Sequence, residues 1–191
     1  MMGDAGSRRD GGTELYRRYL SGDGEAFDEI IETYHDALIH YICGLVHNIA
    51  DAEDIAEDAF CELIVHKNRF TFKSSLKTYL FSIAKNKSVD LVRKSRHISD
   101  KEFEEETALL EDARSLEESV LASEEARAVR DALKAINPDY AEVLRLTYFY
   151  GFSSDEICNI MGKNKRQVAN LLYRGKEAMR DALERKEGEN V

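Results

Sequence analysis

Residues 51–97 join two helix-like patterns of opposite charge, and this stretch restricts the possible folds more than any other. Residues 23–62 contain twelve acidic residues and no lysine or arginine, whereas residues 67–97 contain nine basic residues and a single acid, Asp90. In both parts the apolar residues recur at the spacing of one helix face. The pattern predicts two amphipathic helices, the first suited to a cationic partner and the second to a polyanion such as nucleic acid.

The acidic helix is expected to begin at Asp51, whose side chain makes a good N-cap. The predicted buried stripe of this helix is Ile55, Ala59, Phe60, Leu63 and Ile64. The opposite face carries Asp54, Glu57 and Asp58, and carboxylates near the start of a helix interact favourably with its dipole. The pattern alone fits two interpretations, a face for a cationic partner or a simple solvated acidic face.

The basic helix follows a loop at residues 68–73, in which Phe70 and Phe72 are expected to be exposed among cations such as Lys73. Ser74 or Ser75 can cap this helix. Its predicted buried stripe is Leu76, Leu80, Ile83, Ala84 and Leu91. Another face is shared by Asn86, Asp90, Arg93 and His97, with Lys94 beside it. Such a helix and loop can hold phosphates and stack unpaired bases, although a solvated basic helix fits the pattern equally well.

A single proline and eleven glycines in 191 residues favour an all-α fold. We expect two helical domains joined by an acidic linker, because residues 98–114 are acidic and offer few apolar anchors. A long amphipathic helix from Phe27 to Val46 should pack against the acidic and basic helices. The expected organisation is a disordered tail at 1–13, a first domain at 14–97, the linker at 98–114, a second domain at 115–186 and a tail at 187–191.

The second domain carries clear start and stop signals for helices. Ser115 with Glu118 predicts a capping box for its first helix. Asn137 before Pro138 should end that helix and start the next, because proline suits the first turn of a helix. This second helix is expected to continue to Gly151 through Val143, Leu144, Leu146, Thr147 and Tyr148.

Two short-linked helices follow within residues 152–185. Ser153 with Glu156 predicts another capping box, Gly162 can adopt the left-handed conformation that ends a short helix, and Asn164 with Gln167 can cap the next one. Although the net charge is −10, residues 163–186 hold eight basic residues and three acids. These features indicate a DNA-binding helix-turn-helix rather than a plain helical hairpin with a solvated basic face. The predicted base-contacting residues are Lys165, Arg166, Gln167 and Asn170, with Lys163 and Arg174 placed for phosphates.

Several other classes of protein are disfavoured. Cys43, Cys61 and Cys158 are odd in number and far apart, which argues against a disulfide framework. His40, Cys43 and His47 share a helix face, but no fourth ligand follows at a convincing spacing, so we expect no metal site and no cofactor. We expect no enzyme activity, because no phosphate-binding loop or nucleophile and base stands out. With no membrane-spanning run and no signal-peptide core, we expect a cytoplasmic protein without membrane insertion.

The segments DAEDIAEDAF and KTYLFSIAKNKSVDLVRK resemble the second conserved domain of bacterial RNA polymerase sigma factors of the extracytoplasmic-function (ECF) type. In that family the acidic helix docks on the clamp helices of the polymerase β′ subunit. The following loop and helix recognise and help to open the promoter's minus-ten element. By position, the resemblance assigns polymerase binding to Asp51, Asp54, Glu57 and Asp58. It assigns the minus-ten element to Phe70, Lys73, Asn86, Asp90, Arg93 and Lys94. Tyr79 departs from the family, which usually has tryptophan there.

The segment INPDYAEVLRLTYFYGFSSDEICNIMG resembles the fourth conserved domain of the same sigma factors, which binds the minus-thirty-five element and the polymerase β flap. Ala169 and Leu171 depart from relatives that often carry lysine and arginine there, while Lys165 and Arg166 are added just upstream. The promoter sequence that the chain prefers is therefore expected to differ from that of its relatives. In the family the linker threads toward the template-strand and RNA-exit channels, and many members are held inactive by an anti-sigma factor.

The resemblance implies a sigma factor that confers promoter recognition and melting on core polymerase, with promoter DNA and an anti-sigma factor as further partners. Two alternatives remain open at this point. A free-standing helix-turn-helix regulator would bind an operator as a dimer without polymerase. A sigma-mimicking adaptor would bind an anti-sigma factor but not DNA. The first alternative predicts no dependence on the acidic helix, and the second predicts no dependence on Lys165 and Arg166.

Overall fold

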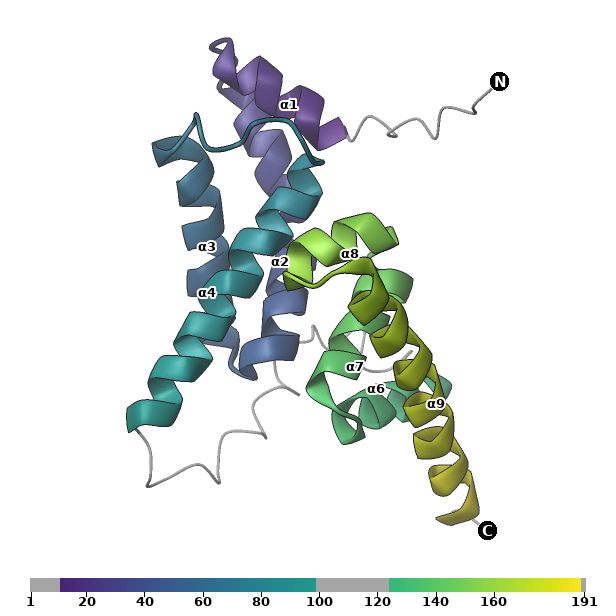
Figure 1. Cartoon of the computed structure of the whole chain (residues 1–191). Coiled ribbons are helices and arrows are strands. Elements are labelled where there is room, and N and C mark those ends of the chain that lie inside the picture. Colours follow the sequence, from purple (N-terminus) through teal and green to yellow (C-terminus); the bar gives the residue numbers. More distant parts are fainter. Residues whose placement is uncertain (1–10, 99–123, 190–191) are drawn as a thin grey trace, which may run out of the picture. The chain divides into compact units, whose positions relative to one another are not determined.

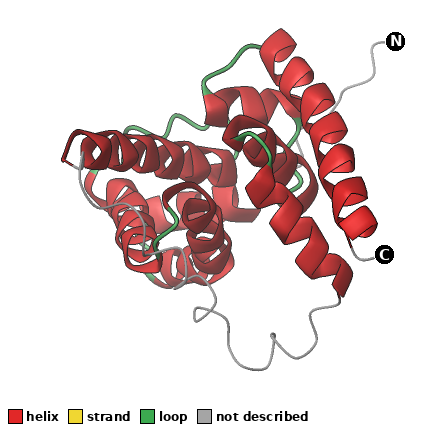
Figure 2. Ribbon diagram, turned by 90° about the horizontal axis from the view of Figure 1, so that it is seen from below, coloured by secondary structure: helices red, strands yellow, loops and turns green. Residues whose placement is uncertain are grey.

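The computed structural model describes residues 11–98 and 124–189. Within these ranges the chain forms helices joined by loops and turns, and it contains no strand (Figure 2). The helices belong to two compact units, one built from α1 to α4 and the other from α6 to α9. The prediction of an all-α chain with two helical domains is confirmed. The predicted linker, apart from its first residue, lies outside the described residues, as do Ser115 and Glu118.

Four helices form the first unit (Figure 1). They are α1 (Gly11–Leu20), α2 (Glu25–Val46), α3 (Ile49–Val65) and α4 (Leu76–Ile98). Apolar residues at helical spacing on each element meet in one core, as the sequence predicts. Tyr41 of α2 packs on Phe81 of α4, with the ring centroids 4.9 Å apart, and His35 of α2 stacks on Phe60 of α3. The largest fully buried side chains of this core are Tyr16, Tyr41, Phe81, Ile30, Leu38, Ile42, Leu63, Leu76 and Leu80.

Helix α1 is fastened to the other helices by Tyr16, which is completely buried. The Tyr16 hydroxyl donates a hydrogen bond of 2.8 Å to the carbonyl oxygen of Leu63 in α3. On the α2 side, Gly12 lies so close to Tyr34 that an added Cβ would come within 2.2 Å of the tyrosine oxygen. Glycine at this position therefore permits the close approach of α1 to α2.

Tyr16 gives the first unit a specific weakness at high pH. Burial, with smaller contributions from Tyr19 and Tyr79, raises the pKa of the Tyr16 phenol to about 12. The unfolded chain loses this proton near pH 10, whereas the folded chain keeps it until about pH 12. The protonated phenol therefore contributes fully to the stability of the fold below pH 10, and this contribution disappears as the pH rises toward 12. We expect the free energy of unfolding, measured by denaturant titration, to fall by about 2 kcal/mol across this interval. Tyr16→Phe should be less stable at neutral pH but should show a shallower decline above pH 10, and an equally steep decline would contradict the assignment.

Some expectations for the helices of this unit differ from the structure. The predicted tail extends to residue 13, but α1 begins at Gly11, which places Gly12 inside the helix. α3 begins at Ile49, so Asp51 lies in its first turn and is not the N-cap. A carboxylate there still favours the helix dipole. Ile64, expected in the buried stripe, is 43% exposed because it lies at the edge of that stripe near the end of α3. Ile83 and Leu91, expected in the buried stripe of α4, are only half-buried. Ser75 is confirmed as the cap of α4, since its side chain accepts from the Thr78 amide.

The second unit is organised around one long helix. Its elements are α6 (Glu124–Ala135), α7 (Pro138–Leu144), the π-helical turn η2 (Arg145–Phe149), α8 (Ser154–Met161) and α9 (Lys165–Glu189). Helices α6, α7 and α8 each pack on α9. The core contains Val143, Leu146, Ile157, Ile160 and Val168, all nearly inaccessible to solvent. Val168 fixes the first turns of α9 against this core, which leaves the remaining residues of those turns facing solvent.

The predicted caps that lie within the described part of this unit are confirmed. The side chain of Asn137 accepts from the Asp139 amide, and Pro138 occupies the first turn of α7. Ser153 and Glu156 form a reciprocal capping box at α8, which ends at Gly162 with a φ of +62°. These local signals join α8 to α9 by a short turn, as in a helix-turn-helix, because glycine adopts that turn conformation without strain.

The helix predicted to reach Gly151 changes character at Arg145. Residues 145–149 form a π-helical turn, which contains more residues per turn than an α-helix and so shifts the direction of the following side chains. The Thr147 hydroxyl donates to the carbonyl oxygen of Val143 at 2.7 Å. The shift leaves Tyr148 58% exposed, with Phe149 62% exposed beside it in sequence.

Candidate nucleic-acid interface

Helix α3 turns a row of carboxylates toward solvent. Asp54, Glu57 and Asp58 are exposed, while Asp51 is half-buried in the first turn. The opposite face buries Ile55 and other apolar residues in the core, so the helix cannot rotate to hide its acids. The structure therefore brings together the four residues predicted to bind polymerase on one solvent-facing surface of α3.

One of these acids already has a partner within the unit. The Asp58 carboxylate lies 2.8 Å from the Nζ atom of Lys87 on α4. An exposed pair of this kind stabilises the fold only slightly. It does join the acidic face of α3 to the basic helix, and local sequence patterns gave no sign of it because the two residues are 29 positions apart.

The loop between α3 and α4 (residues 66–75, the α3–α4 loop) differs from the sequence prediction at one aromatic residue. Phe70 was expected to be exposed and to contact DNA, and the expected exposure is wrong, because Phe70 is only 4% exposed. It packs edge-on against Tyr16 of α1, with the centroids 5.7 Å apart, and lies 5.1 Å from Tyr79 of α4. Phe72 is the accessible aromatic of this loop, at 38% exposure, and the exposed Lys73 follows it.

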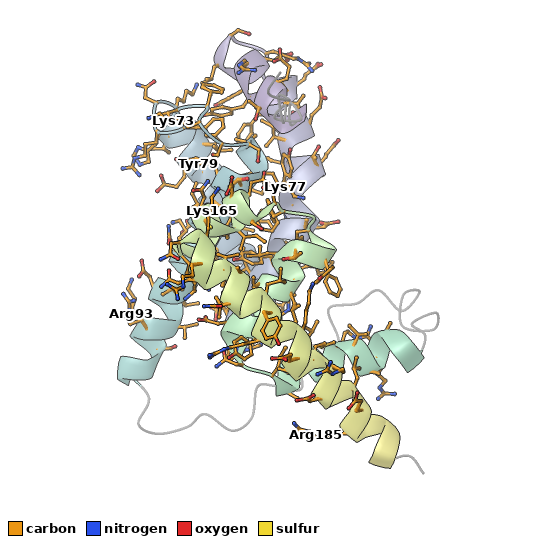
Figure 3. The ribbon with its side chains drawn as sticks, turned by 45° about the vertical axis from the view of Figure 1, so that its right-hand side comes forward. Lys73, Lys77, Tyr79, Arg93, Lys165 and Arg185 are labelled. Atoms are coloured by element: carbon orange, nitrogen blue, oxygen red, sulfur yellow. The ribbon has the colours of Figure 1, made fainter. Side chains whose placement is uncertain are left out.

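The solvent face of α4 carries the other predicted minus-ten residues. Asn86, Asp90, Arg93 and Lys94 are all exposed. Arg93 Nη1 lies 3.7 Å from Asp90 Oδ1, and both side chains remain about two-thirds accessible. Lys73 and Arg93 lie toward opposite ends of the surface formed by the loop and α4 (Figure 3). This surface offers cations and an amide to a polyanion along the length of one helix.

The second unit presents the first turns of α9 to solvent. Lys165, Arg166, Gln167, Asn170 and Arg174 are all exposed, as predicted for a recognition helix. Figure 3 shows Lys165 at the start of α9 and Arg185 toward its far end. Ala169 is also exposed, next to Asn170. The cationic start of α9 can enter a major groove, because the side chains that fix the helix lie on its other face.

Three of these predicted DNA contacts are engaged within the protein. Lys163 Nζ lies 3.1 Å from Asp139 Oδ2, and its side chain is only 30% exposed. Lys165 Nζ lies 2.7 Å from Asp155 Oδ1, and this hydrogen bond raises the pKa of the Lys165 ammonium. The Gln167 side-chain oxygen accepts from the Asn164 amide at 2.9 Å, which leaves its NH₂ group as a donor for a base edge. Binding of DNA by the two lysines requires exchange of a carboxylate for a phosphate or base.

The Lys165–Asp155 pair leads to a testable expectation. Asp155→Asn keeps the size of the side chain but removes the competing charge, so Lys165 becomes available to DNA. We expect affinity for upstream promoter duplex to rise about two- to fivefold, with a steeper dependence on salt concentration. Fluorescence anisotropy of a labelled duplex at several salt concentrations measures this. Asp181→Asn, which removes an exposed acid farther along α9, should change the affinity less, and equal gains in both variants would contradict a specific role for the pair.

Local sequence patterns missed three residues of these surfaces. Phe72 was expected to be exposed but was not selected as a contact. Arg17 of α1 lies over its ring, with the guanidinium carbon 5.0 Å from the centroid. Lys87 was overlooked because only the fold brings it to Asp58.

No group of three or more His, Cys, Asp or Glu side chains in the described part of the chain is placed to hold a metal ion. None of the helices in that part is long and apolar enough to cross a bilayer.

Comparison with protein families identifies both units. The family model described as Sigma-70 region 2 matches residues 30–98, and the one described as Sigma-70, region 4 matches residues 126–179. The matches follow the order of the two units and together cover well over half of the chain. The resemblance noted in the two sequence motifs is confirmed.

Individual relatives agree with this. The chain is 32% identical over 162 residues to ECF RNA polymerase sigma factor BldN of Streptomyces coelicolor, an alignment that covers 84% of this chain and only 61% of BldN. It is 28% identical to the RNA polymerase sigma-H factor of Pseudomonas aeruginosa, over 90% of this chain and 93% of that protein. A similar fold, at a TM-score of 0.67 and 22% identity, occurs in the crystal structure of the sigma factor RpoE with the anti-sigma factor NepR from Bartonella quintana, covering 83% of this chain and 96% of that one. This chain belongs to the sigma-70 family of RNA polymerase sigma factors, in its extracytoplasmic-function group.

Proposed function

We propose that this chain is a dissociable subunit that directs core RNA polymerase to specific promoters and assists their melting. The observation that carries the proposal is the pair of family matches, which assign α3 and α4 to region 2 and the helix-turn-helix to region 4. The family is one of initiation factors. The chain accordingly supplies binding and positioning, while the core enzyme supplies RNA synthesis.

Each surface has a role in this proposal. The acidic face of α3, with Asp54 and Glu57 at its centre, binds the β′ clamp helices. The α3–α4 loop and α4 bind the minus-ten element through Lys73, Asn86, Asp90, Arg93 and Lys94. Phe72 replaces Phe70 as the stacking aromatic, because a buried ring cannot meet a base without leaving the core. The first turns of α9 read the minus-thirty-five element, and the same unit binds the β flap.

Two weak DNA contacts become selective when one enzyme holds both units. Each unit binds one promoter element, and attachment to polymerase fixes the spacing between them, so the second contact forms at a high effective concentration. The acidic segments of the free chain repel DNA and oppose non-specific binding, which supports the proposal that promoter recognition depends on core polymerase. The proposed location is the cytoplasm, where polymerase and chromosomal DNA occur.

An anti-sigma factor is a further proposed partner. The solved RpoE chain is in complex with the anti-sigma factor NepR, and the present chain shares its fold. Such a partner would keep the chain from polymerase until a signal releases it.

Co-elution with core polymerase and DNA footprinting test the proposed function. We expect the chain to co-elute with core polymerase in gel filtration and the resulting holoenzyme to protect two separate promoter segments. Protection of DNA by the chain alone, as a dimer and without polymerase, would instead favour a free-standing regulator. Binding to an anti-sigma factor with no protection in either state would favour an adaptor.

A further inference from the structure

Helix α1 lies outside the family match, which begins at residue 30, yet it contacts the α3–α4 loop at several points. Tyr16 packs against Phe70, and its ring centroid is 6.3 Å from that of Phe72. Lys67, near the start of the loop, places its Nζ atom 4.7 Å from the centre of the Tyr19 ring. One short helix thus contacts both the buried and the exposed aromatic residues of this loop.

Thr13 of α1 completes the cap of α4. Its hydroxyl oxygen accepts a hydrogen bond of 3.1 Å from the Leu76 amide, 63 residues away. The first amides of a helix have no partner within the helix, and the Ser75 side chain accepts a hydrogen bond from the Thr78 amide. Thr13 therefore fixes the point at which the loop ends and α4 begins.

Arg17 holds the exposed aromatic in place. Phe72 has a φ of +60°, which is an unfavourable conformation for a residue other than glycine. Such a conformation persists only where surrounding contacts enforce it. The Arg17 guanidinium covers the Phe72 ring, and Glu14 holds Arg17 from the same helix at 3.1 Å. Arg17 is itself about half exposed, so the ring and the cation face solvent together.

We propose that α1 positions the α3–α4 loop for base capture, with Thr13 and Arg17 as positioning residues that act through Phe72. The ligand is an unstacked base of the single-stranded non-template minus-ten element. Single-stranded bases stack on aromatic rings, and a neighbouring cation strengthens this binding. A ring already fixed in one orientation loses less conformational entropy when the base binds. The inference rests on the proposed function and adds a helix to which the family match assigns no role.

The test uses holoenzyme and a single-stranded oligonucleotide. The oligonucleotide carries the non-template minus-ten sequence of a promoter that the wild-type holoenzyme selects, and a series replaces each base in turn by an abasic site. For wild type, we expect loss of the captured base to weaken binding about tenfold. Arg17→Ala should weaken binding of the intact oligonucleotide by about the same factor and should show little further loss at that abasic site. Arg17→Lys should retain most of the affinity.

Matched controls separate positioning from general stability. Arg18→Ala removes the same charge from the next position, where the side chain pairs with Asp23 at 2.7 Å and with Glu29 of α2 at 3.2 Å, and it should bind like wild type. Thr13→Val should resemble Arg17→Ala, and Thr13→Ser should restore binding because it keeps the hydroxyl. Thr33→Val, which removes a hydroxyl that bonds within α2, should have no effect.

The inference has two contradicting outcomes. Wild-type binding of the intact oligonucleotide by both Arg17→Ala and Thr13→Val would overturn it. So would a loss of core-polymerase affinity in the same proportion as base capture, because α1 would then support the whole unit rather than the loop. Failure of the proposed function is distinguishable, since it would show as a wild-type holoenzyme without selective initiation.

Discussion

Asp54→Lys combined with Glu57→Lys is expected to weaken binding of core polymerase on the order of a hundredfold. Both side chains are exposed on α3, so the substitutions leave the core of the unit unchanged. The proposed polymerase surface is cationic, so the substitutions place lysines opposite other positive charges. Like charges across an interface cost several kcal/mol of binding free energy. Affinity-tag pull-down of core polymerase, followed by titration with labelled protein, measures the loss.

A matched variant tests whether position or total charge is responsible. Glu32→Lys with Asp36→Lys makes the same change of charge on α2, where both residues are exposed. This variant should bind core polymerase nearly as wild type does. Equal losses in the two variants would show that only net charge matters, and unchanged binding by the α3 variant would remove α3 from the polymerase interface.

Lys165→Ala combined with Arg166→Ala is expected to abolish selective use of the upstream element. Both side chains are exposed in the first turn of α9, which is the part of a recognition helix that meets base edges. Each lost base contact should reduce binding about tenfold, and the loss should be larger for the selected promoter than for unrelated duplex. Anisotropy titrations of holoenzyme with duplexes that carry or lack the minus-thirty-five element measure this difference.

The control for this variant lies on the same helix. Arg180→Ala with Arg185→Ala removes two positive charges from the exposed far part of α9. It should weaken binding to all sequences slightly and leave the preference for the upstream element intact. A proportional loss on every duplex by the Lys165 and Arg166 variant would mean that these residues contact phosphates only.

Local rules predicted the helix caps in the described part of the second unit well. The capping box of Ser153 and Glu156, the left-handed Gly162 and the cap at Asn137 depend on residues within a few positions of each other, so the sequence states them directly. The exposed faces of α3 and α9 follow for the same reason, because the spacing of apolar residues decides which side of a helix is buried.

Contacts between distant segments were not predictable in this way. The sequence around Phe70 suggests an exposed aromatic residue in a loop. The ring is nevertheless buried, because Tyr16, which lies 54 residues earlier in the chain, packs against it. Tyr148 follows the helical spacing of its neighbours in sequence, but it lies in the π-helical turn, which shifts the direction of its side chain toward solvent. The role that we infer for α1 likewise depends on Thr13 and Leu76, which only the fold brings together.

Run-off transcription with purified core polymerase tests the central claim most directly. Genomic templates are transcribed with and without the chain, and the start sites are mapped by sequencing the transcripts. The account predicts initiation at a limited set of promoters that share two spaced elements and that core polymerase alone does not use. A start-site distribution identical to that of core polymerase alone, obtained with folded protein, would contradict it.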